Sequence, residues 1–181
     1  MRVISGKARG VTLKTPTGMA TRPTADRVKE AIFSIVQFDL PGANVLDLFG
    51  GTGQLGIEAL SRGAKQAVFV DEREDACKLI KENLKRTKLE EQGSVIRSDY
   101  SAFLKGTTQK FDLILLDPPY AEVFLENSLN LITQIDILQS GGIIVTERPV
   151  EKALLLDFPG YTRSRDYKYG NTLITLFRKN A

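Results

Sequence analysis

Apolar residues recur along the chain with two periods, one typical of helices and the other of buried strands. Spacings of three and four residues predict amphipathic helices from Thr24, the expected N-cap, to about residue 36, and over residues 54–62 and 73–88. Short apolar runs bounded by turn residues predict buried strands at residues 45–49, 67–70, 95–96, 111–116 and 143–146. Because helices and strands alternate, we expect an α/β fold with a doubly wound, mostly parallel sheet.

The two ends of the chain depart from this alternation. Residues 161–168 and 172–177 flank Gly170 and Asn171, a turn sequence that predicts a C-terminal antiparallel hairpin. Residues 3–6 and 11–13 are short, alternating and punctuated by glycine, which indicates a small N-terminal β extension. We expect this extension to span residues 1–22 and one larger domain to span residues 23–181.

Composition narrows the chemistry that the chain can perform. Its 181 residues are 42% apolar, which is enough for one domain with a sizeable core. Cys77 is the single cysteine and histidine is absent, so an internal disulfide, a multi-cysteine metal cage and a histidine base are excluded. We expect no metal, no membrane span and no signal peptide, and a cytoplasmic location. Any chemistry must then rely on carboxylates, backbone groups and aromatic rings.

Charge is distributed unevenly along the chain. Residues 1–30 hold seven basic against two acidic residues, residues 31–159 hold 13 against 19, and residues 160–181 hold five against one. If the two basic ends meet on one face, they make a surface that attracts a polyanion, and nucleic acid is the leading candidate. The alternative is that these lysines and arginines only keep the two ends solvated.

A glycine loop follows the first predicted strand. Residues 51–56 have the spacing G-x-G-x-x-G between a strand and a helix, so a nucleotide-like ligand could lie against the main chain there. Asp47, just before the loop, would repel the pyrophosphate of NAD but could accept hydrogen bonds from the amino group of S-adenosylmethionine. Asp71 ends the next strand and could accept from both ribose hydroxyls. The alternative is a tight turn beside two ordinary strand-end acids.

Two further groups of residues follow later strands. Asp99 could accept from an adenine amino group, with Tyr100 or Phe103 beside the ring, or it could simply cap a helix. The second group is Asp117, Pro118, Pro119 and Tyr120, after the most apolar strand. Its prolines remove two N–H donors and leave outward carbonyls beside a carboxylate, which suits a planar base with an exocyclic amine, and Tyr120 could stack on that base. A rigid turn after a buried strand is the alternative.

These motifs, with Arg2 to Gly6, Arg22 to Thr24 and Lys168 to Thr172, resemble the RsmD-type family of class I S-adenosylmethionine-dependent methyltransferases. The resemblance covers nearly the whole chain. It implies a seven-stranded Rossmann-like methyltransferase sheet and methyl transfer to N2 of a guanine in 16S ribosomal RNA. At 20.0 kDa the protein is small for reading an RNA sequence alone, so we expect its substrate to lie within a small-subunit particle with ribosomal proteins; protein-free RNA is the alternative. The oligomeric state is open, and we favour a monomer.

The resemblance also implies roles for individual residues. Asp117, Pro118, Pro119 and Tyr120 would hold the target base. The cofactor would lie against Thr24, Arg27, Asp47, Phe49, Gly50, Gly51, Thr52, Gly53, Asp71, Glu72, Asp99 and Tyr100. Nucleic acid would contact Arg2, Lys7, Arg9, Lys14, Arg22, Lys168 and Tyr169.

Other functions share parts of this pattern. The Asp-Pro-Pro-Tyr sequence also occurs in adenine-N6 methyltransferases of DNA and RNA, so the motif indicates an amine without choosing between guanine and adenine. A nicotinamide-dependent reductase would share the glycine loop, and an RNA-binding module without catalytic activity would share the basic ends. Gly50 and Gln54 stand where relatives often carry Ala or Ser, which bears on loop stiffness more than on the type of cofactor.

Overall fold

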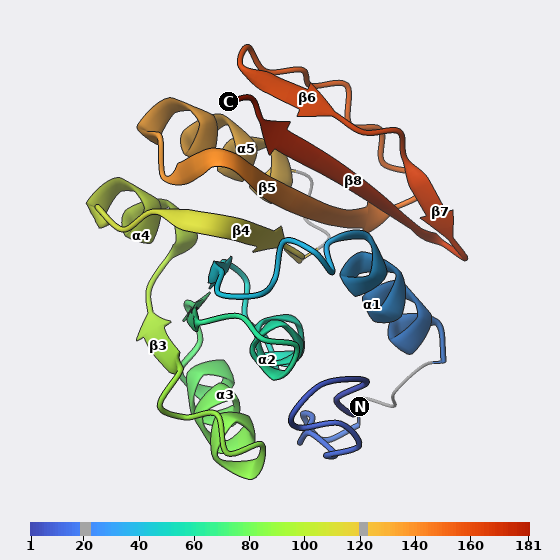
Figure 1. Cartoon of the computed structure of the whole chain (residues 1–181), viewed down its shortest axis with the longest axis vertical. Coiled ribbons are helices and arrows are strands. Elements are labelled where there is room, and N and C mark those ends of the chain that lie inside the picture. The colour runs from blue at the N-terminus through green and yellow to red at the C-terminus, as the bar shows by residue number, and fades with distance from the viewer. Residues whose placement is uncertain (19–22, 120–122) are drawn as a thin grey trace.

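The chain folds into one mixed sheet with helices on both faces, as Figure 1 shows. The computed structural model describes residues 1–18, 23–119 and 123–181. The helices are α1 (Pro23–Ile35), α2 (Gln54–Ser61), α3 (Glu74–Arg86), α4 (Tyr100–Gly106) and α5 (Phe124–Ile135). The strands are β1 (Asn44–Asp47), β2 (Gln66–Asp71), β3 (Gly93–Arg97), β4 (Phe111–Leu116), β5 (Leu138–Pro149), β6 (Tyr161–Arg163), β7 (Tyr167–Tyr169) and β8 (Thr172–Lys179).

The sheet is parallel through its first five strands and antiparallel at its C-terminal end. Its order is β3-β2-β1-β4-β5-β8-β6, and β7 also pairs with β8. Thus β6 and β7 lie along successive stretches of one edge of β8, and the eight strands within the described residues occupy seven positions. The predicted mostly parallel sheet and antiparallel C-terminal strands are confirmed.

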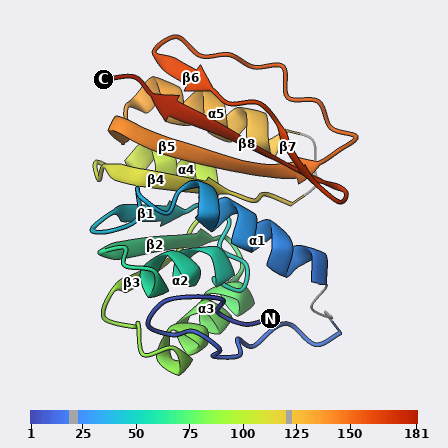
Figure 2. The ribbon, with the colours of Figure 1, turned by 45° about the vertical axis from the view of Figure 1, so that its right-hand side comes forward.

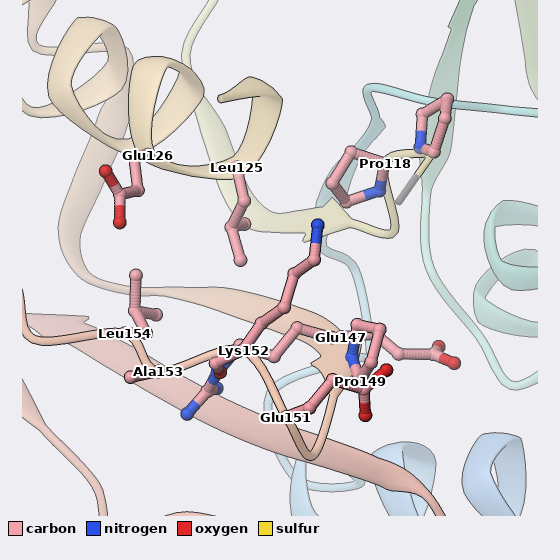
Figure 3. Close-up of a pocket in the computed structure, with 11 residues that line it drawn as sticks. Pro118, Leu125, Glu126, Glu147, Pro149, Glu151, Lys152, Ala153 and Leu154 are labelled. Carbon is pink, nitrogen blue, oxygen red and sulfur yellow. The ribbon is translucent and has the colours of Figure 1, made fainter. Parts of the chain in front are cut away.

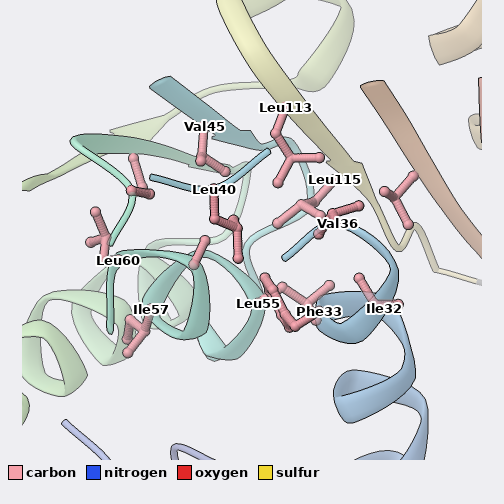
Figure 4. Packing of buried hydrophobic residues seen from close by; sticks show 14 of the residues in the cluster. Ile32, Phe33, Val36, Leu40, Val45, Leu55, Ile57, Leu60, Leu113 and Leu115 are labelled. Carbon is pink, nitrogen blue, oxygen red and sulfur yellow. The ribbon is translucent and has the colours of Figure 1, made fainter. Parts of the chain in front are cut away.

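Strand side chains alternate between two apolar layers, one on each face of the sheet. Val45, Leu113 and Leu115 pack with residues of α1 and α2, in the cluster that Figure 4 shows. Their chain neighbours Leu46 and Ile114 pack on the opposite face, with residues of α4 and α5. Both faces of the parallel strands are therefore buried, as in doubly wound folds. Figure 2 shows α1 and α2 in front of the stacked strands and α4 and α5 behind them.

Several elements differ from the sequence predictions. The predicted strand at residues 161–168 is divided into β6 and β7, and α4 was not among the predicted helices. Helix α1 begins at Pro23, so Thr24 lies inside the first turn and the prediction that it caps the helix was wrong; proline is well suited to a first helical position. Strand β5 is longer than the predicted residues 143–146. Its edge away from β4 pairs with β8 from Ile143 to Pro149, which extends the strand beyond residue 146. Helix α5 was not among the predicted helices.

The N-terminal segment, residues 1–14, is packed onto the larger domain. It forms a narrow loop closed by an antiparallel bridge between Arg2 and Thr12. Its apolar side chains Val3, Ala8 and Leu13 are buried in the same cluster as α1 and α2. The expected small β extension is present, and it shares the core of the domain that follows it.

Buried polar groups hold this N-terminal segment in place. Glu58 on α2 is fully buried and accepts the backbone N–H groups of Ile4 and Ser5 at 2.9 and 3.0 Å. Its charge is balanced by Arg62, whose Nε donates at 2.9 Å, and by buried Lys29 on α1, with Nζ 3.6 Å away. Burial lowers the pKa of Lys29, and the charge of Glu58 opposes this shift. The segment therefore docks through charge-assisted hydrogen bonds that require both helices.

Candidate active site

Acidic residues follow the strand order along the carboxyl edge of the sheet. The parallel strands lie in the order β3, β2, β1, β4 and β5, and an acidic residue stands at, or within two residues of, the carboxyl end of each. In the same order, these acids are Asp99, Asp71, Asp47, Asp117 and Glu147. Parallel strands bring their carboxyl ends to one edge, where ligands of α/β sheets bind at the point of strand-order reversal. That point lies between β1 and β4, so the glycine loop after β1 and the prolines after β4 are on neighbouring strands.

The glycine loop forms an open backbone cradle. Gly51 and Gly53 have φ of 58° and 81°, a region that favours glycine, and Gly53 is the N-cap residue of α2. A Cβ added at Gly51 would meet only the Phe49 carbonyl oxygen, at 3.9 Å, so there is free space beside this peptide. By contrast, a Cβ at Gly50 would come within 2.7 Å of Ile80. A ligand can therefore approach the main chain at Gly51, which is the fit that an S-adenosylmethionine site requires.

Asp47 supports this loop from beneath. It is only 1% exposed, and its Oδ2 accepts the backbone N–H of Gly56 at 3.0 Å. Burial raises the pKa of Asp47 to about 8; the Gly56 hydrogen bond opposes the shift, and the charges of Asp117 and Asp71 add to it. With Oδ2 engaged by the helix, Oδ1 is the oxygen left for a ligand amine.

Asp71 ties the end of β2 to the same loop. Its Oδ2 accepts from Gly51 N–H and its Oδ1 from Arg73 N–H, both at 3.0 Å. Glu72 beside it is exposed. Asp99 caps α4 by accepting from Ala102 N–H at 3.0 Å, so the helix-cap interpretation is confirmed for one of its oxygens. The predicted contacts of these three acids with a cofactor stay predictions.

Three aromatic rings cluster beside the carboxyl end of β1. The Phe49 and Tyr100 centroids are 5.4 Å apart, and Phe124 at the start of α5 lies 5.5 Å from Tyr100, edge to face. Sequence reasoning proposed Phe49 and Tyr100 and missed Phe124, which helix α5 brings into place. The three rings offer an apolar surface between the ends of β1 and the starts of α4 and α5.

Asp117, Pro118 and Pro119 follow β4, on the other side of the point where the strand order reverses. Asp117 is half-buried, Pro118 is buried and Pro119 is exposed. Burial raises the pKa of Asp117 to about 6. Tyr120, the expected stacking residue, lies outside the described residues.

A cavity of about 250 Å³ opens beside the two prolines, with its lining drawn in Figure 3. Pro118 and Leu125 of α5 form one side, and β5 with the loop after it forms the other. The lining residues are Pro118, Pro119, Leu125, Glu126, Glu147, Arg148, Pro149, Glu151, Lys152, Ala153 and Leu154. This cavity borders the prolines that follow Asp117 and offers a space in which a planar base could lie.

Glu147 is the cavity residue that sequence reasoning missed. Burial raises its pKa to about 8, and the nearby charge of Asp117 adds to the shift. A signal was available, because Glu147 follows the apolar run of residues 143–146 just as the other acids follow their strands. It was overlooked because no motif marks it.

Arg148 fixes the wall of the cavity. Its buried guanidinium donates to the Lys152 carbonyl at 2.9 Å, to Thr175 Oγ1 at 2.6 Å and to Asp166 at 2.8 Å. These three bonds join the loop after β5 to β8 and to the segment before β7. The loop therefore has a defined position without a helix or strand of its own.

The candidate nucleic-acid residues lie in two regions. Arg2, Lys7, Arg9 and Lys14 are exposed on the N-terminal segment, although Arg2 pairs with Asp26 at 3.8 Å and Lys14 pairs with Glu82. Lys168 is exposed on β7. Arg22 lies outside the described residues, and the structure does not describe the side chain of Thr24.

Arg27 and Tyr169, which sequence reasoning assigned to different ligands, line one groove of about 470 Å³ between α1 and β7. The structure therefore places Arg27 with a candidate nucleic-acid residue. No three acidic or cysteine side chains gather as a metal site in residues 1–18, 23–119 and 123–181. Within the same residues, every helix is too short or too polar to cross a membrane.

Comparison with known proteins identifies relatives along the full chain. Residues 1–178 match the family model described as "Conserved hypothetical protein 95". The Bacillus subtilis protein YlbH, provisionally named an rRNA methyltransferase, is 40% identical over all of both chains. "Ribosomal RNA small subunit methyltransferase D" of Escherichia coli is 32% identical over 100% of this chain and 91% of its own.

Among solved structures, the Escherichia coli protein yhhF, described as a methyltransferase on a provisional basis, superposes with a TM-score of 0.90. It has 28% sequence identity and covers 100% of this chain and 98% of its own. The match includes the N-terminal segment and the C-terminal strands as well as the parallel sheet. The chain therefore belongs to the Conserved hypothetical protein 95 family, which is the RsmD family that its motifs resemble.

Proposed function

We propose that this protein methylates ribosomal RNA, transferring a methyl group from S-adenosylmethionine to the exocyclic N2 of a guanine in the 16S RNA of the small subunit. One observation carries the proposal: the bare backbone at Gly51 and the acceptor pair of Asp117 and the Pro118 carbonyl stand on neighbouring strands. A donor and an acceptor substrate would then meet at one switch point. Both relatives are named as ribosomal RNA methyltransferases, the Escherichia coli one for the small subunit, and these names support the choice of RNA.

The cofactor side of the site would hold the methyl donor through groups that already have fixed positions. Asp47 Oδ1 would accept from the amino group, the peptides of Gly51 to Gly53 would lie along the chain of the ligand, and Asp71 would accept from the ribose. Bound S-adenosylmethionine supplies an activated methyl group on a positively charged sulfur. It carries no phosphate, which fits a loop whose acids Asp47 and Asp71 present acceptor oxygens and no cation for a pyrophosphate.

The acceptor side would orient the amine. The nitrogen of an exocyclic amine is a weak nucleophile because its lone pair is spread into the ring. Hydrogen bonds from its two N–H groups to Asp117 and to the Pro118 carbonyl would localise that pair and direct it in line toward the methyl group. The amine would lose its proton after attack, with the Asp117 carboxylate placed to receive it.

The N-terminal segment would provide the nucleic-acid surface. Its exposed Arg2, Lys7, Arg9 and Lys14 carry charge that attracts phosphate, and the buried Glu58 network holds their backbone in one shape. A 20.0 kDa protein has little surface with which to read a long sequence. We therefore expect the assembled small-subunit particle, including its ribosomal proteins, to be the substrate, and we expect the enzyme to act as a monomer.

The test is methyl transfer to small ribosomal subunits isolated from cells that lack their own enzyme of this family. Incubation with methyl-labelled S-adenosylmethionine should label the 16S RNA, and digestion followed by mass spectrometry should yield N2-methylguanosine. N6-methyladenosine in the digest would contradict the choice of guanine. Calorimetric binding of NADH, without binding of S-adenosylmethionine, would overturn the proposed cofactor. Equal labelling of protein-free 16S RNA would contradict the expectation of a particle substrate.

A further inference from the structure

Glu147 and Asp117 occupy matching positions at the ends of adjacent strands. In the parallel pair of β4 and β5, Leu116 is in register with Thr146, so the next residue on each strand is an acid. Glu147 also lines the cavity beside Pro118 and Pro119, on the side opposite Pro118 in Figure 3. A base held by Asp117 and the Pro118 carbonyl would therefore have Glu147 next to it.

Neither of these carboxyl groups is satisfied within the protein. Among the described residues, no side chain or backbone N–H donates to Asp117 or Glu147, and neither acid forms an ion pair. No fully buried side-chain oxygen of the described residues lacks a partner, so the unpartnered oxygens of both acids are open to solvent and free to accept from a ligand. The Asp117 acceptor already has a function in the proposed reaction, whereas Glu147 has none.

Purine bases differ in what they present beside the reactive amine. Guanine carries its N1–H donor next to the N2 amine, so one edge presents three N–H groups to acceptors. Adenine has ring nitrogens with lone pairs on both sides of its N6 amine. An additional acceptor next to the Asp117 and Pro118 pair therefore matches guanine, and it repels adenine because two acceptors would face each other.

We propose that Glu147 is a specificity-determining residue, which accepts the N1–H of the target guanine while Asp117 and the Pro118 carbonyl hold the N2 amine. This inference rests on the proposed methyl transfer and adds to it the residue that chooses between the two purines. A protein site built to satisfy a substrate N–H discriminates strongly against an analogue that lacks it.

Several charged groups surround Glu147. Asp117 faces it from β4, with Asp47 one strand further on β1. Glu126 from α5 and Glu151 and Lys152 from the loop after β5 line the same cavity, while Arg148 on β5 is engaged by Asp166. The paired residue on β8 is Ile174, which does not titrate.

The protonation state of Glu147 then affects how well it discriminates. Because burial and Asp117 raise its pKa to about 8, the carboxyl in the free protein keeps its proton near neutral pH, and its O–H can donate to a ring nitrogen. The ionised form can only accept. Preference for a base with N1–H should therefore increase as the pH rises from 6.5 to 8.5.

The sharpest probe is 2-aminopurine, which keeps the 2-amine of guanine but has a lone pair in place of N1–H. Once the methylated position is mapped, 16S RNA ligated from fragments can carry either base there and be assembled into small subunits. For the unaltered protein at pH 8.5, where the Glu147 carboxyl is mostly ionised and can only accept, kcat/KM should be at least about tenfold higher with guanine. Glu147→Gln should reduce this ratio several-fold by accepting 2-aminopurine, because the amide can either accept or donate. Glu91→Gln, in an exposed turn far along the sequence from the site, is the matched control and should keep the ratio.

Each outcome decides the inference. An active Glu147→Gln protein with the unaltered ratio overturns the role of Glu147 and leaves the proposed methyl transfer intact. If Glu147→Gln is inactive on both bases, the pH dependence of the ratio in the unaltered protein decides: an increase toward pH 8.5 supports the role, and a flat ratio overturns it. Failure of the unaltered protein to methylate guanine would overturn the proposed function, and this inference with it.

Discussion

The two halves of the carboxyl edge satisfy their acids in opposite ways. On the cofactor side, Asp47, Asp71 and Asp99 each accept a backbone N–H at 3.0 Å, from Gly56, Gly51 and Ala102. On the acceptor side, Asp117 and Glu147 receive no hydrogen bond from any described residue. Acidic residues at one edge of one sheet are thus bonded to the backbone in one half and accept from no described residue in the other.

This difference indicates a division of labour within the site. Acids that already accept from the backbone hold the glycine loop and the start of α2 in one geometry, so the cofactor half is organised before its ligand arrives. Acids that accept from no protein group and are open to solvent are free to accept from a substrate. We therefore expect substitutions in the first half to change cofactor affinity and loop order, and substitutions in the second half to change turnover and base choice.

The largest effect should come from Asp117→Asn. The amide keeps the shape of the side chain but exchanges one acceptor oxygen for a donor, so the amine loses its alignment. We expect kcat for methyl transfer to fall by about 100- to 1,000-fold, as when one aligned polar group is removed from other active sites. Calorimetry should show cofactor affinity within about twofold of the unaltered protein, a difference of under about 0.5 kcal/mol. A comparable loss of cofactor affinity would contradict the division.

Asp71→Ala should produce the reverse pattern. It removes the acceptor for Gly51 N–H and for a ribose, so cofactor affinity should weaken by about 10- to 100-fold, in line with the loss of a charge-assisted hydrogen bond. Turnover at saturating cofactor should be largely retained. Asp75→Ala, which removes an exposed acid four residues away, is the control and should change neither quantity. Loss of turnover at saturation, with affinity unchanged, would place Asp71 in the acceptor half.

Stability should depend on pH through acids of both halves. The pKa of Asp47 and that of Glu147 are each raised to about 8 in the folded state, so both keep protons that the unfolded chain has released above about pH 4. The unfolded state then binds fewer protons, and the free energy of unfolding should fall as pH rises from 5 to 8. The slope is about 1.4 kcal/mol per pH unit for each proton.

Urea unfolding at pH 5, 6, 7 and 8 measures this slope. Asp47→Asn and Glu147→Gln should each make the slope less steep by about 1.4 kcal/mol per pH unit, the contribution of one proton. Acids with lowered pKa, such as Asp136 and Asp166, contribute in the opposite direction and only below this range. A slope that neither substitution changes would show that these carboxyls are ionised in the folded protein.

The smallest expected effect is that of Gly51→Ala. The added methyl group has room, so the cost is the left-handed backbone at φ 58°, about 1 to 2 kcal/mol of folding free energy. Cofactor affinity should fall as well, because the methyl group occupies the space beside the peptide. Gly10→Ala, at φ 82° with open space around it, should cost similar stability and leave cofactor affinity unchanged. Equal cofactor affinity in both variants would argue against a ligand at Gly51.

Much of the parallel sheet could be predicted from the sequence because each buried strand is a short apolar run between turns. Strand β4 matches its prediction at both ends, and α2 matches within one residue. Helix α5 was not predicted although Leu125, Leu129 and Ile132 have helical spacing, because its N-cap residue, Val123, has no capping side chain that would mark the start of a helix.

Contacts between distant residues could not be predicted. Lys29 and Glu58 read as ordinary surface charges in helical segments, yet both are buried against each other. Nothing in the spacing of Arg27 and Tyr169 shows that they line one groove, since α1 and β7 come together only in the folded chain. Sequence patterns thus indicated which chemical groups gather at the edge, and the fold decides which of them are already bonded to the backbone.

The docking of the N-terminal segment has a consequence for how the protein forms. Ile4, Ser5 and Ala8 bond to Glu58 and Ser61, more than 50 residues further along the chain. Asn83, later still, joins the backbone of residue 14 to the glycine loop. The N-terminal segment is synthesised before these partners, so it must wait for much of the sheet before it can dock, and such long-range contacts form slowly. A nascent chain would show its basic segment to the surroundings well before it can bind a cofactor.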